Sequence, residues 1–174
     1  MKTYSTILLF FAITLSGLLF SSCNESDDIS GIFLDKQWKL TRILIDNGSS
    51  KSPIATHYWN GNEEAMKKSN ELLNQKGNFV IQFAGFEENN KITGKNATYS
   101  GRATTVAISG NWSVDGESNT FSTTQQSVSD GDVLGTAFIN ALKNAYKYTG
   151  DYNNLQIYFK EGKDKYYLLL RVDE

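Results

Sequence analysis

The chain of 174 residues has one cysteine, Cys23, one histidine, His57, and one proline. A single cysteine cannot form a disulfide within the chain, and a structural zinc site usually takes four Cys or His ligands. Histidine is the commonest general base near neutral pH, so a serine-hydrolase triad would have to use His57, yet the chain has no G-x-S-x-G motif. We therefore expect no catalytic residues, no metal and no cofactor.

An excess of charge of one sign is also lacking. The formal net charge is −2, from 17 basic and 19 acidic residues, whereas nucleic-acid-binding proteins usually display a basic patch or stripe. The adjacent pairs Glu63-Glu64 and Glu87-Glu88 lie in polar stretches, whereas the two carboxylates of a glycosidase face each other across a cleft. The sequence therefore predicts no nucleic-acid partner, and a protein that is not an enzyme.

Residues 1–22 have the pattern of a secretory signal peptide. Lys2 supplies a positive start, residues 7–20 are almost wholly apolar, and the small residues Ser21 and Ser22 follow. A positive start, an apolar middle and small residues at the end are typical of such signals. The apolar run is shorter than the roughly 17–25 residues that a membrane-spanning helix needs. We expect the mature protein to begin at the next residue.

That next residue is Cys23, which ends the sequence Leu19-Phe20-Ser21-Ser22-Cys23. This junction resembles the lipobox of bacterial lipoproteins, in the looser form found among the Bacteroidota, with Phe20 where a strict lipobox has leucine. The resemblance implies cleavage before Cys23, acylation of its thiol and a stable membrane anchor, because several acyl chains together hold a protein on a bilayer. The alternatives are an ordinary signal peptide followed by a free cysteine, or a buried N-terminal helix.

Residues 23–31 are polar and are predicted to form a flexible tether between the lipid and the folded domain. They include the acidic residues Glu25, Asp27 and Asp28. This cluster resembles the signal that sends some Bacteroidota lipoproteins to the outer face of the outer membrane, although acidic residues also simply solvate a linker. We expect a lipid-anchored outer-membrane protein that is exposed on the cell surface.

Residues 32–174 are predicted to form one α+β domain with an antiparallel, barrel-like sheet and two packed helices. Residues 63–75 and 132–147 have helical patterns, and the second segment has the clearer apolar stripe, centred on Phe138. Other segments alternate with the period of two that strands show. The first expected strand is 37–46, whose alternation shifts phase, as in a strand with a β-bulge or in one buried on both faces at its end. We then expect a strand at 79–83, short β segments around 91–93 and 98–108, a strand at 120–128, and a final hairpin of 155–159 and 166–172.

Three parts of this domain resemble META/HslJ-like domains. The resemblance rests on Trp38-Lys39-Leu40 for the opening strand, on Phe138-Ile139-Asn140-Ala141-Leu142 for the late helix, and on Tyr148 and Leu155-Gln156-Ile157-Tyr158 for the final hairpin. It implies an antiparallel barrel-like sheet with packed helices, in secreted or envelope proteins, and it supplies no catalytic residues. A lipocalin-like (calycin) barrel is the alternative fold.

Two aspartates, Asp130 and Asp132, precede the second helix. Such residues can cap a helix or can ligate calcium. The spacing of an EF-hand is missing, so the sequence favours capping.

His57, Tyr58 and Trp59 form the best candidate for a binding loop, followed by Asn60-Gly61-Asn62. Aromatic side chains combine a large contact area with a polar handle, so these three residues are expected to bind a small apolar ligand or a glycan. The alternative is that Tyr58 and Trp59 only cover the core.

Two functions remain open: a non-catalytic binding module, or a structural lipoprotein that acts through contacts with envelope proteins. A pocket beside Trp59 favours the first. A filled barrel with an exposed apolar patch favours the second.

Overall fold

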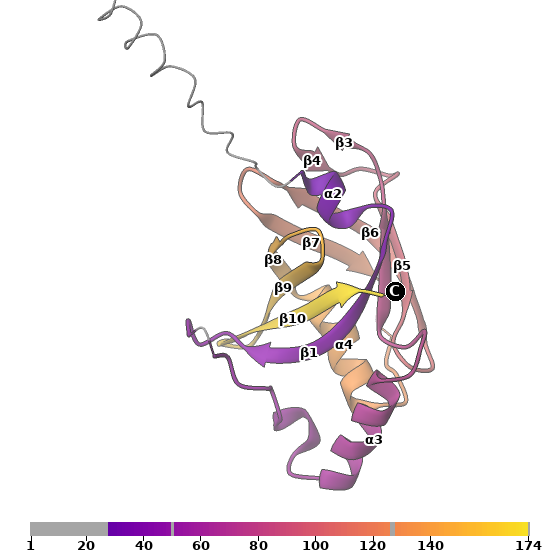
Figure 1. Cartoon of the computed structure of the whole chain (residues 1–174), viewed down its shortest axis with the longest axis vertical. Helices are drawn as coiled ribbons and strands as arrows, with labels where there is room; N and C mark the ends of the chain where they lie inside the picture. The colour runs from indigo at the N-terminus through magenta and orange to yellow at the C-terminus, as the bar shows by residue number, and fades with distance from the viewer. Residues whose placement is uncertain (1–27, 50, 126–127, 174) are drawn as a thin grey trace, which may run out of the picture.

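The computed structural model describes residues 28–49, 51–125 and 128–173. Within this part of the chain, ten strands form one antiparallel sheet (Figure 1). The strands are β1 (Gln37–Ile45), β2 (Val80–Ala84), β3 (Glu87–Glu88), β4 (Lys91–Ile92), β5 (Thr98–Arg102), β6 (Ala107–Asp115), β7 (Thr120–Gln125), β8 (Ala145–Gly150), β9 (Asn154–Glu161) and β10 (Asp164–Val172). The helices are α2 (Ile29–Phe33), the 3-10 turn η1 (His57–Trp59), α3 (Glu63–Leu73) and α4 (Val133–Lys143). Among these described elements, no helix is long and apolar enough to cross a membrane.

Eight of the strands close into a barrel. In the order β1-β2-β5-β6-β7-β8-β9-β10, each strand pairs antiparallel with the next, and β10 pairs back with β1. The order around the ring follows the order along the chain, which makes this an up-and-down barrel, a closed form that removes the exposed edges of a sheet. The β3–β4 hairpin is inserted between β2 and β5 and extends the sheet beside β6. The expected barrel-like α+β fold is therefore confirmed.

Strand β1 contains the predicted bulge. Trp38 and Leu40 are buried, the register with β10 shifts between Leu40 and Arg42, and then Ile43 and Leu44 are both buried. A bulge inserts an extra residue into one strand and so changes which side chains face the core. Here the shift leaves the Arg42 side chain on the exposed surface.

Helix α2 closes one end of the barrel, which the sequence did not predict. The Phe33 ring is fully buried, with its centroid 5.4 Å from that of Phe83, 5.7 Å from Phe121 and 5.0 Å from Tyr148. Ile29 is also 0 % exposed. The predicted tether through residue 31 is therefore too long, and the folded domain includes Asp28, whose side chain caps α2. Residues 1–27, including the predicted signal peptide and Cys23, lie outside the described residues.

Helix α4 lies at the opposite end, beside α3 (Figure 1). Its Phe138 ring is fully buried and meets Phe79 edge-on at 6.0 Å. The helix ends at Lys143, four residues before the predicted end, and β8 begins at Ala145. The apolar stripe continues into Ala145, but that residue pairs with Phe159 of β9. Barrel closure therefore decides the structure of this segment over its helical pattern.

We expect Phe138→Ala to lower the free energy of unfolding by about 3–5 kcal/mol, as truncations of buried aromatic side chains do. The matched control is Asn140→Ala on the exposed side of α4, which should change stability by less than about 0.5 kcal/mol. Chemical denaturation measures both variants. Equal, small effects would contradict the packing of α4 against the barrel.

Candidate functional site

The three predicted binding residues form η1, and a surface hollow lies on each side of this turn. Tyr58 lines a hollow of about 330 Å³, here called the Tyr58 hollow. Trp59 lines a hollow of about 360 Å³, here called the Trp59 hollow. The segment predicted from the sequence therefore contributes one residue to each of two hollows. The side chains that line each hollow decide which of the two can hold a ligand.

His57 and Tyr58 share one carboxylate. Nε2 of His57 lies 3.3 Å from Oε2 of Glu161, and the Tyr58 hydroxyl donates to Oε1 of Glu161 at 3.0 Å. Burial and the neighbouring Glu161 carboxylate raise the pKa of Tyr58, so its hydroxyl stays protonated and remains a donor. These bonds fix η1 to the end of β9.

The Trp59 side chain is part of the hydrophobic core. It is buried, and its Nε1 donates to Oγ of Ser69 at 2.9 Å. Ser69 donates in turn to Oδ2 of Asp132 at 2.8 Å, and Oδ1 of Asp132 accepts from the amide of Gly135 at 3.1 Å. One buried chain of hydrogen bonds therefore joins η1, α3 and the start of α4. It also confirms Asp132 as the predicted helix cap.

Asp130 holds the turn between β5 and β6. Its carboxylate accepts from the amides of Thr104, Thr105, Val106 and Asp132, at 2.9–3.1 Å, and from the Thr104 hydroxyl. Partial burial acts to raise the pKa of Asp130, but these hydrogen bonds to the charged form outweigh it and lower the pKa to about 2. Asp130 thus supports the fold and is not available to a ligand. No cluster of three or more His, Cys, Asp or Glu side chains that could hold a metal occurs among the described residues.

The polar groups of the Tyr58 hollow are mostly used by internal bonds. Asp130, Asp132 and Glu161 accept the bonds described above, and the Thr136 hydroxyl bonds both the amide and the carbonyl of Asp130. A ligand in this hollow would have to break bonds that hold α4 and η1 in place. The Tyr58 hollow is therefore the weaker candidate.

The Trp59 hollow combines an apolar wall with unused polar side chains. The wall consists of Ile43, Ile54, Ala55, Trp59, Leu73 and Leu134. Thr41 and Arg42 of β1, Asn70 of α3 and the C-terminal cap residue of this helix, Asn74, lie at the same surface. Within the described part of the chain, the side chains of Arg42, Asn70 and Asn74 have no hydrogen-bond or ion-pair partner. This hollow therefore offers one cation and two amides to a ligand.

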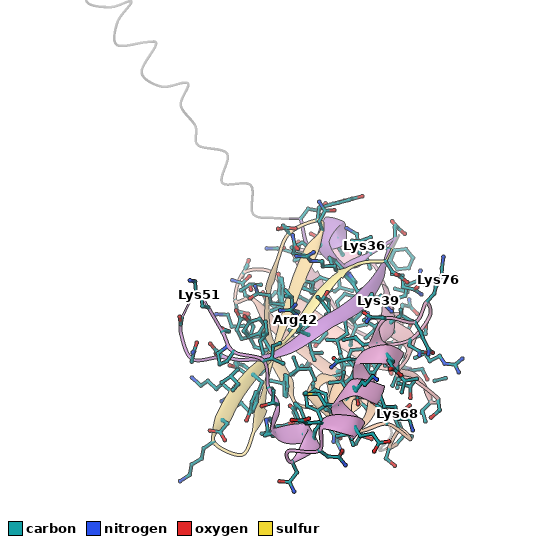
Figure 2. The ribbon with its side chains drawn as sticks, turned by 60° about the horizontal axis from the view of Figure 1, so that its bottom comes forward. Lys36, Lys39, Arg42, Lys51, Lys68 and Lys76 are labelled. Atoms are coloured by element: carbon teal, nitrogen blue, oxygen red, sulfur yellow. The ribbon has the colours of Figure 1, made fainter. Side chains whose placement is uncertain are left out.

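Figure 2 shows Arg42 on β1, on the same face of the molecule as α3. Asn70 and Asn74 are one helical turn apart, so their side chains lie on the same side of α3. None of these three residues was predicted from the sequence to take part in a site. The phase shift in β1 and the repeat of asparagine at i and i+4 were the available signals, but neither shows that β1 and α3 lie next to each other.

Comparison with known proteins places the chain in a family. A family model described as a domain of unknown function, DUF4847, matches residues 24–172. The chain belongs to the DUF4847 family. A crystal structure of a DUF4847 family protein from Bacteroides vulgatus ATCC 8482 is similar, with a TM-score of 0.58 and 22 % sequence identity over 82 % of this chain and 96 % of that one. This likeness shows a shared fold. A search of curated proteins found no match.

Two resemblances noted in the sequence, to META/HslJ-like domains and to the lipobox of bacterial lipoproteins, remain predictions. The comparisons show neither a META/HslJ-like domain nor lipid attachment at Cys23. The binding role of His57, Tyr58 and Trp59 likewise stays a prediction, because their positions describe the geometry of the loop and not its occupancy.

The stabilising role of Asp130 in this DUF4847 domain can be tested through the dependence of the free energy of unfolding on pH. A carboxylate with a lowered pKa stabilises the fold above its unfolded pKa, near 3.8, and this stabilisation is lost as the pH falls towards the folded pKa of about 2. We expect Asp130→Asn to lower the free energy of unfolding at pH 7 by about 1–3 kcal/mol, because amide donors lose a charged acceptor. The variant should also lose less stability than the wild type between pH 4 and pH 2. Denaturant titrations across this range measure both effects, and parallel pH profiles would contradict the account.

Proposed function

We propose that this DUF4847 protein is a lipid-anchored envelope protein whose barrel domain binds a small ligand in the Trp59 hollow, without catalysing a reaction. The observation that carries the proposal is the set of unpartnered side chains of Arg42, Asn70 and Asn74 beside an apolar wall. Ligand pockets typically combine a largely apolar lining with a few convergent polar groups. The volume of about 360 Å³ lies at the small end of the usual range for such pockets.

The lining supports a ligand that has both an apolar face and polar groups. A guanidinium binds a carboxylate or phosphate through two parallel hydrogen bonds, and this pairing is stronger than bonds between neutral groups. The two asparagine amides can each donate to and accept from a hydroxyl group. A glycan with an acidic sugar, or a small apolar acid, fits this chemistry best.

The ligand is proposed to bind outside the barrel and not within it. Up-and-down barrels of eight strands include the lipocalins, which can hold one small ligand inside. In this chain the end of the barrel beneath α2 is occupied by the rings of Phe33, Phe83, Trp112, Phe121 and Tyr148. The up-and-down order of the eight strands supports the lipocalin-like alternative for the fold, whereas the filled end supports a ligand site outside the barrel. Kinship with META/HslJ-like domains remains a proposal carried by the sequence resemblance.

Anchorage is proposed at Cys23, on the outer membrane and with the domain on the cell surface. The lipobox-like junction and the acidic residues behind it carry this part of the proposal. The DUF4847 match begins at residue 24, directly after the proposed attachment residue, and this spacing is consistent with the proposal.

The second candidate function is a structural lipoprotein that contacts other envelope proteins. The exposed rings of Phe86 and Tyr152, together with the filled end of the barrel, favour it. The two candidates differ in where they place the functional surface, and a test for small-ligand binding separates them.

We expect a protein of residues 24–174 to bind members of a panel of acidic and neutral sugars and small apolar acids, measured by calorimetry. Arg42→Ala should weaken binding of the acidic members about 10–100-fold, because a charge-assisted hydrogen bond is lost. The matched control is Arg171→Ala, on the neighbouring strand β10, which should bind like the wild type. A panel without any binder would contradict the binding module, whereas binding that ignores Arg42 would remove only the role of this residue.

Lipid attachment at Cys23 should be visible in the mass of the mature protein. Wild-type protein extracted from membranes should be heavier than the polypeptide 23–174 by its acyl chains, because the Cys23 thiol carries them. Cys23→Ala should lack this added mass and leave the membrane fraction. Intact-mass spectrometry of both proteins is the measurement, and an unacylated mature wild type would refute the anchor.

A further inference from the structure

The two most exposed large hydrophobic side chains of the described residues are both aromatic. Phe86 is 81 % exposed and Tyr152 is 68 % exposed, whereas Ile54, Val128 and Val133 are 39–44 % exposed. Burial of apolar surface is the main favourable term in folding and in most association. Two rings left in solvent to this degree point to a contact that the domain makes with something else.

Both rings lie beside helix α2. Phe86 precedes Glu87, whose carboxylate accepts from the hydroxyl of Ser30 at 2.6 Å and from its amide at 3.1 Å. On the other side, the carbonyl of Tyr152 accepts from Nζ of Lys36 at 3.0 Å, and the same Nζ lies 3.3 Å from the centre of the Tyr152 ring. Lys36 also donates to the carbonyl of Gly31 in α2. The β2–β3 turn and the β8–β9 turn thus present one aromatic side chain each at the end of the barrel that α2 closes.

The chain itself brings this end towards a membrane. The domain begins at Asp28, and Ile29 is fully buried. Five residue steps separate Asp28 from Cys23, and a fully extended chain of that length spans at most roughly 18 Å. An acylated Cys23 would therefore hold the α2 end within roughly 18 Å of the bilayer surface. A long tether would allow a much larger distance.

We propose that the α2 end of the barrel is a membrane-contact face, and that Phe86 and Tyr152 enter the interfacial region of the bilayer. This inference rests on the proposed lipid attachment at Cys23. Tyrosine suits the headgroup level because its ring is apolar and its hydroxyl is polar, and phenylalanine buries its whole ring below that level. The occupant is a lipid surface and not a protein, because the anchor fixes which surface this end can reach.

The charges of this face define the lipid that it prefers. Asp35, Glu87, Glu88 and Asp151 lie next to the aromatic residues in the sequence or next to Lys36 in space. Acidic side chains repel anionic headgroups, and salt screens this repulsion. The contact should therefore be closest on zwitterionic bilayers. Helix α3 lies at the opposite end of the molecule from α2 (Figure 1), so the Trp59 hollow, which is lined in part by Asn70 and Leu73 of α3, should open away from the membrane.

Quenching by brominated lipids tests the face directly. The acylated Phe86→Trp protein is purified from membranes and placed in phosphatidylcholine vesicles with brominated acyl chains. The native residues Trp38, Trp59 and Trp112 are buried in the domain and give a constant background, measured on the wild type. We expect the added emission of Phe86→Trp to fall at least about twofold, because an interfacial ring lies next to the acyl chains. The control Val133→Trp, at the far end beside α3, should keep its emission.

A second experiment tests the membrane-contact face independently of the proposed lipid attachment. Protein of residues 23–174 carrying Phe86→Trp, made without a signal peptide, is coupled through its Cys23 thiol to a maleimide lipid in the same vesicles. Quenching in this experiment, with an unacylated protein in cells, would keep the face and refute the proposed anchorage. Unquenched Phe86→Trp emission in a protein that mass spectrometry shows to be acylated would overturn the membrane-contact face and leave the anchor standing.

Discussion

The packing of one ring, Phe33, into the end of the barrel is the interaction on which the rest of the structure depends. It meets Phe83 of β2, Trp112 of β6, Phe121 of β7 and Tyr148 of β8, with centroids 5.0–5.7 Å apart. Strands that are far apart in the sequence therefore share one contact. The contact includes β7 and β8, whose own ladder has one residue pair, Thr120 with Lys147. Aromatic pairs in edge-to-face and offset-stacked arrangements add stabilisation beyond the area they bury. Phe33 meets Tyr148 edge-on and Phe121 stacked, so it strengthens the barrel where its hydrogen bonding is thinnest.

Three properties of the molecule follow from this ring. The filled end of the barrel places the proposed ligand site on the outer surface, at the Trp59 hollow with Arg42, Asn70 and Asn74. The burial of α2 moves the start of the domain to Asp28 and shortens the link to Cys23. The short link in turn holds the α2 end, with the proposed membrane-contact face, towards the bilayer. The proposed ligand site, at the opposite end, then faces away from it. The chain of Trp59, Ser69 and Asp132 then sets the position of α3 that shapes the hollow.

Features with a local signature could be predicted from the sequence, and features made by distant contacts could not. The β9–β10 hairpin alternates cleanly on both sides of its turn, and the phase shift in β1 marked its bulge. The burial of Phe138 followed from its place in an apolar stripe. Helix α2 was missed because Ile29, Ile32 and Phe33 give a single helical turn among polar residues, too short to show a period.

The candidate site was only half predictable for the same reason. Tyr58 and Trp59 each line one concave surface, and the sequence pointed to their segment because a cluster of aromatic residues in an irregular stretch is a local signal. Arg42 and Asn70 are 28 positions apart, and only the closed barrel with α3 beside β1 brings them to one hollow.

Nuclear Overhauser effects between aromatic rings test the central claim most directly. In a protein of residues 24–174, the Phe33 ring protons should give cross-peaks to the rings of Trp112 and Tyr148, whose centroids lie 5.1 Å and 5.0 Å away. Their chemical shifts should also be displaced by the surrounding rings. A Phe33 ring with the shifts of an unstructured chain and no cross-peak to either partner would contradict the filled barrel, the early start of the domain and the orientation built on them.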